Sequence, residues 1–385
     1  MNINISNKFI FFTCLILGIY LCIIGGYGSD EDTLPMIGTF VNFLDGNFMT
    51  SRFTGYPVSE FIIGFFSYYF GSTAINLIIF ISFIIGSALF FICLENKIGL
   101  NNIIKFLILI LSSPILFFDN LEPVDYSIPF IFLSLGFFSI TKKRTELAVI
   151  FFGISIGARI NFVPFIIALI IFSDKKYFND QYSKAFLILT SLFAGALFYL
   201  PVWIHSGLGF DWLTAGRPEG GLLEYFARFS YKTILTFGFL QSIIIFYLVK
   251  KILEKKINSN YKILISIIIL NLLIFLYIPA ELSYLQPMLV CVYYLAYKIL
   301  NNKYFYTLLI INFFTWFLTF QVIEIQYKYK NKCDPIVAEK VKFELQLTKG
   351  YFFKFLQKRN MISCWIDPNT SYGQKVLRGE ALKKK

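Results

Sequence analysis

Three consecutive acidic residues, Asp30, Glu31 and Asp32, directly follow the first long apolar run of the chain. A carboxylate in this position is held near the end of a helix, where it could accept a proton from an incoming hydroxyl or amine. Asp125 and Glu281 follow later apolar runs in the same way. The acidic residues therefore predict a general base at the end of the molecule where these turns meet, although any single one also fits a solvated loop carboxylate.

Arginine residues in two unusual settings supply the complementary charge. Arg159 stands between Ala158 and Ile160 inside an apolar stretch, and a buried arginine is by default a functional hypothesis with a nearby acidic partner. Arg217 lies in the Gly-rich segment GRPEGG, where a guanidinium could hold two phosphate oxygens at once. The alternatives are an interfacial anchor for Arg159 and an exposed loop side chain for Arg217. The other polar candidates at the same end are Arg52, Asp125, His205, Glu281 and Tyr284.

The composition of the whole chain indicates a membrane protein. Of its 385 residues, 57% are hydrophobic and only 15% are charged, and the mean hydropathy is +0.67. A soluble domain carries roughly 25% charged residues. These values exclude a disordered chain, a collagen, a disulfide-stapled secreted miniprotein and an ordinary cytosolic enzyme. We expect an all-α, polytopic integral membrane protein.

Apolar runs long enough to cross about 30 Å of hydrocarbon predict about 11 transmembrane helices. The expected spans are residues 9–26, 72–94, 103–118, 128–140, two short helices within 147–172, and then 185–204, 233–249, 263–280, 287–300 and 304–325. Between the first two spans lies a polar stretch, residues 29–56, followed by Pro57–Phe70. This second segment is aromatic but only 14 residues long, which suits an interfacial helix in the first outer loop better than a crossing.

The stretch Leu147–Phe172 is interrupted by Gly157, Arg159, Asn161 and Pro164, and basic residues flank both of its ends. The positive-inside rule places both flanks in the cytoplasm, so we expect two short helices whose tips meet near Arg159. The same rule places the basic clusters KKR, DKK and KKILEKK inside and most of the acidic turns outside. The candidate site then faces the extracytoplasmic side of the membrane.

Residues 326–385 form a basic tail that carries 14 Lys and Arg against five Asp and Glu. We divide the chain into a transmembrane domain, residues 1–325, and this tail, which we place on the extracytoplasmic side. Cys333 and Cys364 could form a disulfide there, since disulfides require an oxidising compartment. The tail suits contact with anionic lipid headgroups or with an anionic substrate. Nothing resembles a nucleic-acid-binding module, and with His205 as the only histidine a zinc site is not expected.

Several segments, in their order along the chain, resemble the GT-C-fold glycosyltransferases. The similarity covers about the first 300 residues and is greatest to the subgroup of lipopolysaccharide-core glycosyltransferases, aminoarabinose transferase and protein mannosyltransferases. The segments that carry it are Ser29-Asp30-Glu31-Asp32, Leu44-Asp45-Gly46, Gly55-Tyr56-Pro57, Phe70-Gly71, Asp125 in a second acidic loop, Gly157-Ala158-Arg159 with Pro164, and Glu281 to Pro287. None of these motifs is specific by itself; their order carries the resemblance.

The resemblance implies a GT-C-like enzyme of the bacterial inner membrane. Such an enzyme takes a sugar from a polyprenyl-phosphate carrier on the outer face and passes it to a lipid, glycan or protein. Asp30 would activate the acceptor, and Glu31 or Asp32 could share that role. The implied contacts to the carrier phosphate and the sugar are Arg159, Arg217, Glu281 and Tyr284. Some relatives use a divalent metal, which Asp30 with Asp125 could hold, and no other cofactor is implied.

Two other functions fit parts of the sequence. A polysaccharide polymerase or ligase of the cell envelope would use Arg and His side chains in a large late loop, such as residues 205–232. A transporter or flippase would show charged residues in the middle of several spans, and two related halves with matching broken helices. Here the charges lie at the ends of spans and one broken stretch stands out, so the glycosyltransferase is the preferred prediction.

Overall fold

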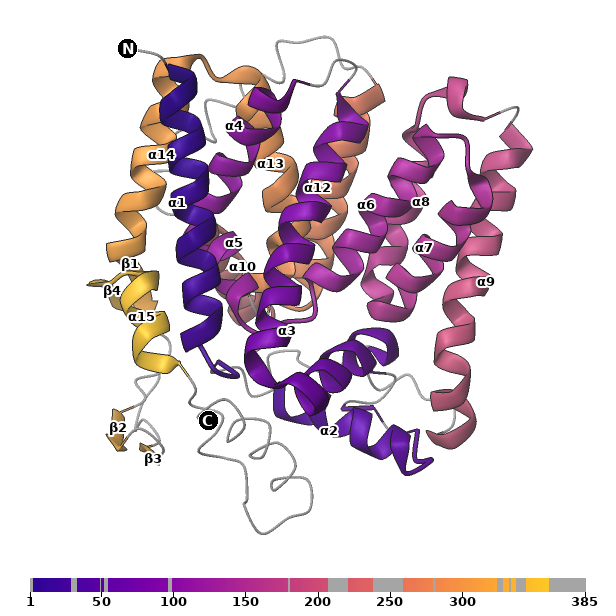
Figure 1. Cartoon of the computed structure of the whole chain (residues 1–385), viewed down its shortest axis with the longest axis horizontal. Coiled ribbons are helices and arrows are strands. Elements are labelled where there is room, and N and C mark those ends of the chain that lie inside the picture. Colours follow the sequence, from indigo (N-terminus) through magenta and orange to yellow (C-terminus); the bar gives the residue numbers. More distant parts are fainter. Residues whose placement is uncertain are drawn as a thin grey trace.

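The computed structural model of the chain describes residues 3–28, 33–48, 50–51, 55–95, 99–178, 181–206, 221–237, 259–279, 282–323, 328–331, 334–336 and 344–359. Most of these residues are helical, and the long helices run up and down between two ends of the molecule (Figure 1). We call the end at which the first helix begins the upper end, at the top of Figure 1, and the opposite end the lower end.

Helices account for most of the regular structure. The α-helices are α1 (Ile3–Ile24), α2 (Thr33–Leu44), α3 (Pro57–Leu94), α4 (Leu100–Ser112), α5 (Pro114–Phe118), α6 (Ser127–Thr141), α7 (Thr145–Ala158), α8 (Val163–Phe172), α9 (Gln181–Ser206), α10 (Gly221–Phe237), α12 (Ser259–Tyr277), α13 (Gln286–Ile299), α14 (Asn302–Phe317) and α15 (Tyr351–Lys358). The 3₁₀ helices are η1 (Asp119–Leu121), η2 (Ile160–Phe162), η3 (Lys175–Tyr177) and η5 (Leu282–Leu285). The strands are β1 (Leu318–Ile323), β2 (Lys328–Asn331), β3 (Asp334–Ile336) and β4 (Glu344–Lys349).

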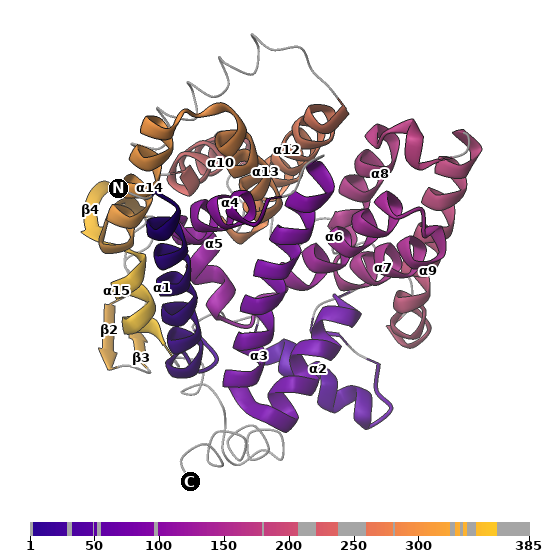
Figure 2. The same cartoon turned by 45° about the horizontal axis from the view of Figure 1, so that its top comes forward.

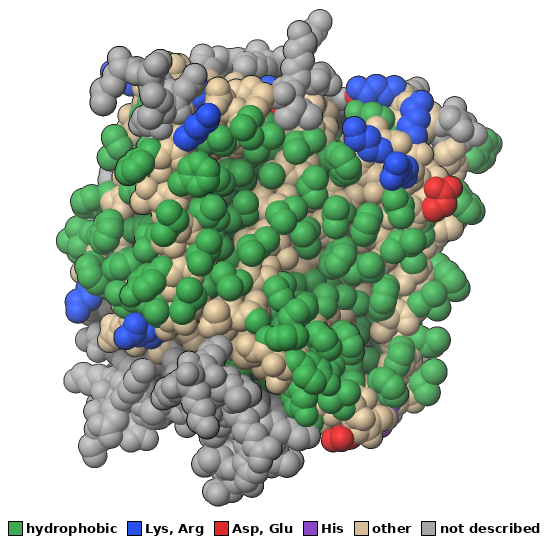
Figure 3. Space-filling model, viewed as in Figure 1, with side chains coloured by type: hydrophobic (Ala, Val, Ile, Leu, Met, Phe, Trp, Pro, Cys, Tyr) green, Lys and Arg blue, Asp and Glu red, His purple; other side chains and the backbone are tan. Residues whose placement is uncertain are grey.

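Among the described residues, four helices are long and apolar enough to cross a membrane, or five if the bent pair α4 and α5 forms one span. The four are α1, α3, α9 and α12, and shorter apolar helices include α6, α7 and α8. Hydrophobic side chains cover the middle of the face drawn in Figure 3, with Lys and Arg near its upper and lower ends. The chain thus has the helices of a membrane protein, whereas the number of about eleven crossings stays a prediction.

Helix α3 is two helices joined at Gly71, whose φ of 75° and ψ of −177° lie outside the helical range. A positive φ is accessible to glycine because it lacks a Cβ. The segment Pro57–Phe70 lies across the lower end beside α2, and the remainder of α3 runs to the upper end (Figures 1 and 2). The separate helix expected at Pro57–Phe70 is therefore present, and Gly71 marks its end.

Helix α2 lies within the stretch 29–56, for which the sequence predicted a polar segment and no particular secondary structure. Its 12 residues include no charged side chain, but the run is too short to be recognised as a crossing and acidic residues stand on both sides of it. Phe40 of α2 packs on Phe61 and Phe65 of α3, with ring centroids 5.3 and 5.7 Å apart. These edge-to-face contacts hold the two helices together at the lower end.

The third expected span, residues 103–118, is not straight. Helix α4 ends at Ser112 and α5 begins at Pro114, and the helices on the two sides of this break are bent by 91°. The residue between them is extended because a proline ring disfavours a helical conformation in the residue before it. The Nε1 of Trp316 in α14 donates to the Ser112 carbonyl at 2.7 Å. A neighbouring helix thus satisfies a polar group that the break leaves without its helical bond.

The stretch 147–172 forms two short helices that meet near Arg159, as predicted. Helix α7 ends at Ala158, Arg159 is extended (φ −163°, ψ 114°), and Pro164 stands in the first turn of α8. The hydroxyl of Ser59 in α3 donates to the Ala158 carbonyl at 2.9 Å. The last carbonyl of α7 therefore has a partner even though the helix stops there.

Helices α7 and α9 approach each other closely through small residues. A Cβ added to Gly157 would lie 2.7 Å from the Cβ of Phe198, and one added to Gly153 would lie 2.7 Å from the Cβ of Ala194. Small residues four apart allow such close approach between membrane helices. The contact fixes the last turn of α7, and with it the break that follows.

The last expected span, residues 304–325, ends earlier than predicted. Helix α14 stops at Phe317, and β1 follows and pairs antiparallel with β4, so that Leu318 lies opposite Lys349. Apolar and polar side chains alternate through β4 and most of β1, which is the period of a strand. A hydropathy average cannot distinguish this strand from the end of a helix, and the expectation of an all-α chain is wrong for these residues.

Helix α15 packs part of the tail against the membrane helices. Phe355 is buried, its ring lies 5.9 Å from that of Phe118 in α5, and it shares a core cluster with Trp316. Cys333 and Cys364 lie outside the described residues. The disulfide and the side of the membrane on which the tail lies therefore stay predictions.

Candidate functional site

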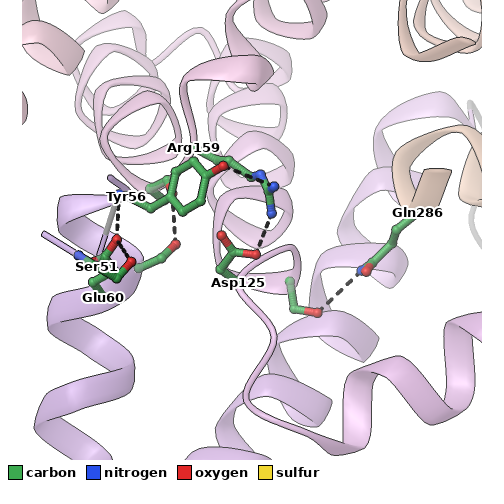
Figure 4. A network of polar contacts seen from close by, with 9 residues as sticks. Ser51, Tyr56, Glu60, Asp125, Arg159 and Gln286 are labelled. Carbon is green, nitrogen blue, oxygen red and sulfur yellow. Dashed lines mark hydrogen bonds and ion pairs between the residues drawn. The ribbon is translucent and has the colours of Figure 1, made fainter. Parts of the chain in front are cut away.

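Arg159, at the break between α7 and α8, is a buried cation of which only 2% is exposed. Its Nη1 forms an ion pair with Oδ1 of Asp125, and the two side chains are 3% and 4% exposed (Figure 4). Asp125 lies in the loop between η1 and α6. The acidic partner expected for this arginine is thus identified, and it neutralises a charge that would be very unfavourable to bury alone.

Three tyrosine rings surround the guanidinium of Arg159. Its central carbon lies 4.5 Å from the ring centroid of Tyr56, 3.5 Å from that of Tyr126 and 5.0 Å from that of Tyr284. All three distances are within the range of cation–π attraction. Nη2 also donates to the Tyr56 hydroxyl at 3.3 Å, while Nε has no hydrogen-bond partner among the described residues. We call this arrangement, with Asp125, the arginine cage.

The cage joins segments that are far apart in the sequence. Tyr56 immediately precedes α3, Tyr126 immediately precedes α6, and Tyr284 lies in η5. The carbonyl of Tyr284 accepts from Nδ2 of Asn271 in α12 at 2.9 Å, which holds η5 in place. Arg159 is therefore the point at which the first loop, the second acidic loop and the late turn meet.

Glu60 is a second buried charged residue near the cage, and it has no exposed surface. Its carboxylate accepts four hydrogen bonds, from Thr39 Oγ1, Ser51 Oγ and the Ser51 backbone N–H, each at 2.7 Å, and from the Tyr56 N–H at 2.9 Å (Figure 4). Several hydrogen bonds of this kind offset the loss of water around a buried carboxylate. Glu60 thereby ties the loop that carries Tyr56 to α2 and α3.

Hydrogen bonds among three buried side chains, Asn120, Ser127 and Gln286, position the loop that carries Asp125. Asn120 and Ser127 stand on either side of this loop, and the Ser127 hydroxyl donates to Oδ1 of Asn120. The Nε2 of Gln286, at the start of α13, donates to Asn120 Oδ1 at 3.3 Å and to Ser127 Oγ at 3.4 Å (Figure 4). All of these side chains are buried, so the two ends of the loop are fixed relative to α13.

The end of α1 lies against the same acidic loop. A Cβ added to Gly28 would collide with the carboxylate of Glu122. Gly28 therefore packs against the second acidic loop, while Asp30, the expected base, lies outside the described residues.

An apolar groove of about 380 Å³ opens beside the cage, between α2, the start of α3 and the last turns of α9. Its lining consists of Phe40, Phe43, Leu44, Phe48, Pro57, Val58, Phe61, Phe198, Pro201 and Val202. Pro57 directly follows Tyr56 in the sequence. Phe198 packs against Gly157, which stands two residues before Arg159. The lining of the groove is therefore connected to the arginine cage through Tyr56–Pro57 and through the contact of Gly157 with Phe198.

The structure brings together some of the residues predicted from the sequence. Asp125, Arg159 and Tyr284 meet in the cage. His205 is exposed in the last turn of α9, and within the described part of the chain no contact joins it to Arg159. The predicted residues that lie outside the described residues are Asp30, Glu31, Asp32, Arg52, Arg217 and Glu281.

Sequence reasoning missed Tyr56, Tyr126 and Glu60 as members of the site. Glu60 had a visible signal, because it is the only charged residue in Pro57–Phe70. Tyr56 appeared only as part of the segment Gly55-Tyr56-Pro57, and nothing distinguished Tyr126 from the other tyrosines of a chain that contains 24. The resemblance leaves a divalent metal open. No group of three His, Cys, Asp or Glu side chains that could hold one occurs among the described residues, and the pairing of Asp30 with Asp125 lies partly outside them.

The arrangement is chemically suited to a molecule with an anionic head and an apolar chain. A guanidinium in a water-poor cage can stabilise a phosphate oxygen through charge-assisted hydrogen bonds, and the adjoining groove can accept hydrocarbon. Comparison of the chain with protein-family models, with curated proteins and with solved structures gave no match. The geometry of the cage and the groove is therefore the basis on which a function can be inferred.

Proposed function

We propose that this protein is a membrane glycosyltransferase that moves a sugar from a polyprenyl-phosphate donor to a lipid, glycan or protein acceptor. The observation that supports this most is a buried arginine whose aromatic cage includes Tyr56, the residue directly before Pro57 in the lining of an apolar groove. The reaction is assigned to the lower end, which we take to be the extracytoplasmic face of a bacterial inner membrane.

The Tyr56 hydroxyl marks the place where a donor phosphate would bind. Its hydrogen bond to Nη2 of Arg159 is long, 3.3 Å, and involves no negative charge. A phosphate oxygen makes a charge-assisted bond to a guanidinium that is about twice as strong as a neutral one. The phosphate would replace this bond, while Asp125 keeps Nη1 in place.

The chemical step is a displacement at the anomeric carbon of the donor sugar. A carboxylate of the trio Asp30, Glu31 and Asp32 takes the proton of the acceptor hydroxyl or amine. The acceptor atom forms a bond to the anomeric carbon as the bond from that carbon to the phosphate oxygen breaks. The electron pair of the broken bond stays on the polyprenyl phosphate, and Arg159 stabilises the charge that develops there.

Purified protein with a labelled polyprenyl-phosphate sugar tests this proposal. We expect release of polyprenyl phosphate, loss of that release in Asp30→Asn, and a reduction of about 10²–10³-fold in Arg159→Lys, since one stabilising donor contributes that much. Lys303→Gln, which removes an exposed cation at the upper end, is the matched control and should retain full activity. Full activity in Asp30→Asn, Glu31→Gln and Asp32→Asn alike would refute the base assignment.

A flippase is the second candidate, because the structure contains a second broken helix. In addition to the break between α7 and α8, the chain is broken between α4 and α5. Transporters use discontinuous helices of this kind around their substrate sites. In proteoliposomes, a flippase would move a labelled polyprenyl-phosphate sugar across the bilayer without cleaving it. Translocation with no cleavage would replace the transferase proposal by this one. The polymerase or ligase alternative depends on residues 205–232, many of which lie outside the described residues.

A further inference from the structure

The turn between α6 and α7, at the upper end, carries three exposed cations in a row, Lys142, Lys143 and Arg144. The N–H of Lys143 donates to the Ile140 carbonyl, and the N–H of Arg144 donates to the Ser139 carbonyl, both at 2.9 Å. These two bonds form the capping pattern with which many helices end, and its special position is most often occupied by glycine.

Lys143 occupies that position with a φ of 57°, and it is the only non-glycine residue with positive φ among the described residues. An L-residue with a Cβ is strained in this left-handed conformation, whereas glycine is not. A cation near the end of a helix is favourable, but Lys142 already supplies one at the end of α6. The lysine at 143 therefore needs a second reason, and its exposed ammonium group provides one.

A second basic segment lies at the same end, between α8 and α9. Lys176 is exposed, although Asp174 lies 3.3 Å from its Nζ. Lys184 donates to the carbonyls of Ile171 and Ser173 at 2.7 Å, which caps the end of α8. Figure 3 shows Lys and Arg side chains gathered over the upper ends of α6 to α9. Among the described residues of these two turns and the first turn of α7, the acidic residues are Asp174 and Glu146, so cations are in excess there.

The surface directly below these cations is apolar. Ile150 in α7 is 52% exposed, Ile171 in α8 is 50% exposed, and Phe186 in α9 is 68% exposed. Tyr182, at the start of α9, is 84% exposed, and tyrosine is enriched where hydrocarbon meets headgroups. Exposed cations, an exposed tyrosine at the start of α9 and exposed apolar side chains on the same helices match the boundary of a bilayer.

We propose that Lys142, Lys143, Arg144 and Lys176 form a docking surface for the headgroups of anionic phospholipids that pack against α6 to α9. The charge is complementary, and the exposed apolar residues below accept the acyl chains of the same lipids. Free phosphate or a soluble protein would use the cations but not the apolar surface. The docking surface lies at the end opposite the arginine cage, so it does not depend on the proposed enzymatic activity.

Thermal unfolding of the full chain in micelles, titrated with phosphatidylglycerol, tests this surface. Lipid that binds only the folded protein raises the Tm, and the rise grows with the logarithm of the lipid concentration above the Kd. We expect such a rise with phosphatidylglycerol and little with phosphatidylcholine of the same chains. Each cation near a charged membrane surface contributes enough that its removal should weaken the apparent affinity about fivefold. The triple variant Lys142→Gln, Lys143→Gln, Arg144→Gln should therefore lose most of the response.

The control removes the same charge from the same end but from other helices. It combines Lys8→Gln, Lys105→Gln and Lys303→Gln, in α1, α4 and α14, and should keep the response to phosphatidylglycerol. An equal loss in both triple variants would show that only overall charge matters and would overturn the proposal. An equal rise of Tm with inorganic phosphate would also overturn it, because the apolar surface would then have no role.

Lys143→Gly separates the backbone strain from the lipid contact. Glycine relieves the left-handed strain, so the Tm without anionic lipid should be at least as high as that of the unchanged protein. The response to phosphatidylglycerol should nevertheless weaken about fivefold, as for any cation removed from the surface. A full response in Lys143→Gly would show that this lysine serves only the turn, and the docking surface would have to be abandoned.

Discussion

Two ion pairs at opposite ends of the molecule show how differently the same charges can be used. Arg159 and Asp125 are both buried, with side chains 3% and 4% exposed, and aromatic rings surround the arginine. Lys298 lies 2.9 Å from Glu95, but its side chain is 36% exposed and that of Glu95 is 12% exposed. One pair is enclosed by protein and the other lies at the upper end within reach of solvent.

The difference lies in what happens when one partner is removed. Water can solvate Lys298 if Glu95 is lost, so the exposed pair contributes little to stability. No water replaces Asp125 around Arg159, so the remaining charge would be buried alone, which is strongly destabilising. A pair of this kind is weak evidence for stability, because an apolar pair of similar size could do as well. Its presence in the cage is better explained by function.

The largest effect is expected for Asp125→Leu. Breaking a buried pair by removing one partner destabilises a protein by about 3–5 kcal/mol, because the other charge is left uncompensated. We expect the free energy of unfolding in micelles to fall by about this amount. Far-ultraviolet circular dichroism during denaturant titration would measure it.

The double variant Asp125→Leu, Arg159→Met is the matched control for that experiment. It removes both charges, so most of the lost stability should return, while transfer activity should stay absent. If the double variant is as unstable as Asp125→Leu alone, the buried charge is not the source of the loss. The contrast between the buried and the exposed pair would then have no basis.

A smaller effect is expected for Glu60→Gln. The amide keeps the shape of the carboxylate. Its NH₂ group, however, faces the same N–H and O–H groups that donate hydrogen bonds to the carboxylate, and it cannot accept from them. A buried polar group left without a partner typically costs about 1–3 kcal/mol. We also expect faster hydrogen exchange at the backbone N–H groups of Ser51 and Tyr56, which the carboxylate now holds.

Ser51→Ala provides a graded control, because it removes one of the four hydrogen bonds and leaves the charge in place. Its loss of stability should be smaller than that of Glu60→Gln. An unchanged exchange rate at Tyr56 in Glu60→Gln would mean that the carboxylate does not hold the loop. Glu60 would then have no part in positioning the arginine cage.

Local signals explain which parts of the site could be predicted from the sequence. Arg159 is a charge in an apolar run, and Gly157 and Pro164 beside it break a helix. Both the break and the need for an acidic partner follow from these few residues. The bend between α4 and α5 had a local signal too, Pro114, but the run around it was long and apolar enough to be taken as one straight span.

Tyr284 was among the predicted site residues, but the other two tyrosines of the cage were not, because their role depends on contacts between distant segments. Tyr56 and Arg159 are 103 residues apart, and the tyrosine becomes meaningful only when α3 and α7 pack together. In a chain with 24 tyrosines, no spacing shows that Tyr56 and Tyr126 would lie at the guanidinium. The strand β1 escaped prediction for a different reason, since its partner β4 lies beyond the last apolar run.

The smallest effect is expected at the exposed pair. Lys298→Ala should lower the free energy of unfolding by about 1 kcal/mol or less, since solvent screens the interaction. Glu95 also accepts from the Tyr294 hydroxyl at 3.0 Å, so it keeps a partner when the lysine is gone. A double-mutant cycle with Glu95→Gln, measured at low salt and at about 1 M salt, isolates the pair. The coupling energy should fall at high salt, whereas the effect of Asp125→Leu should not. A coupling of about 3 kcal/mol or more, unchanged by salt, would place both pairs in the same class and remove the distinction drawn between the two ends.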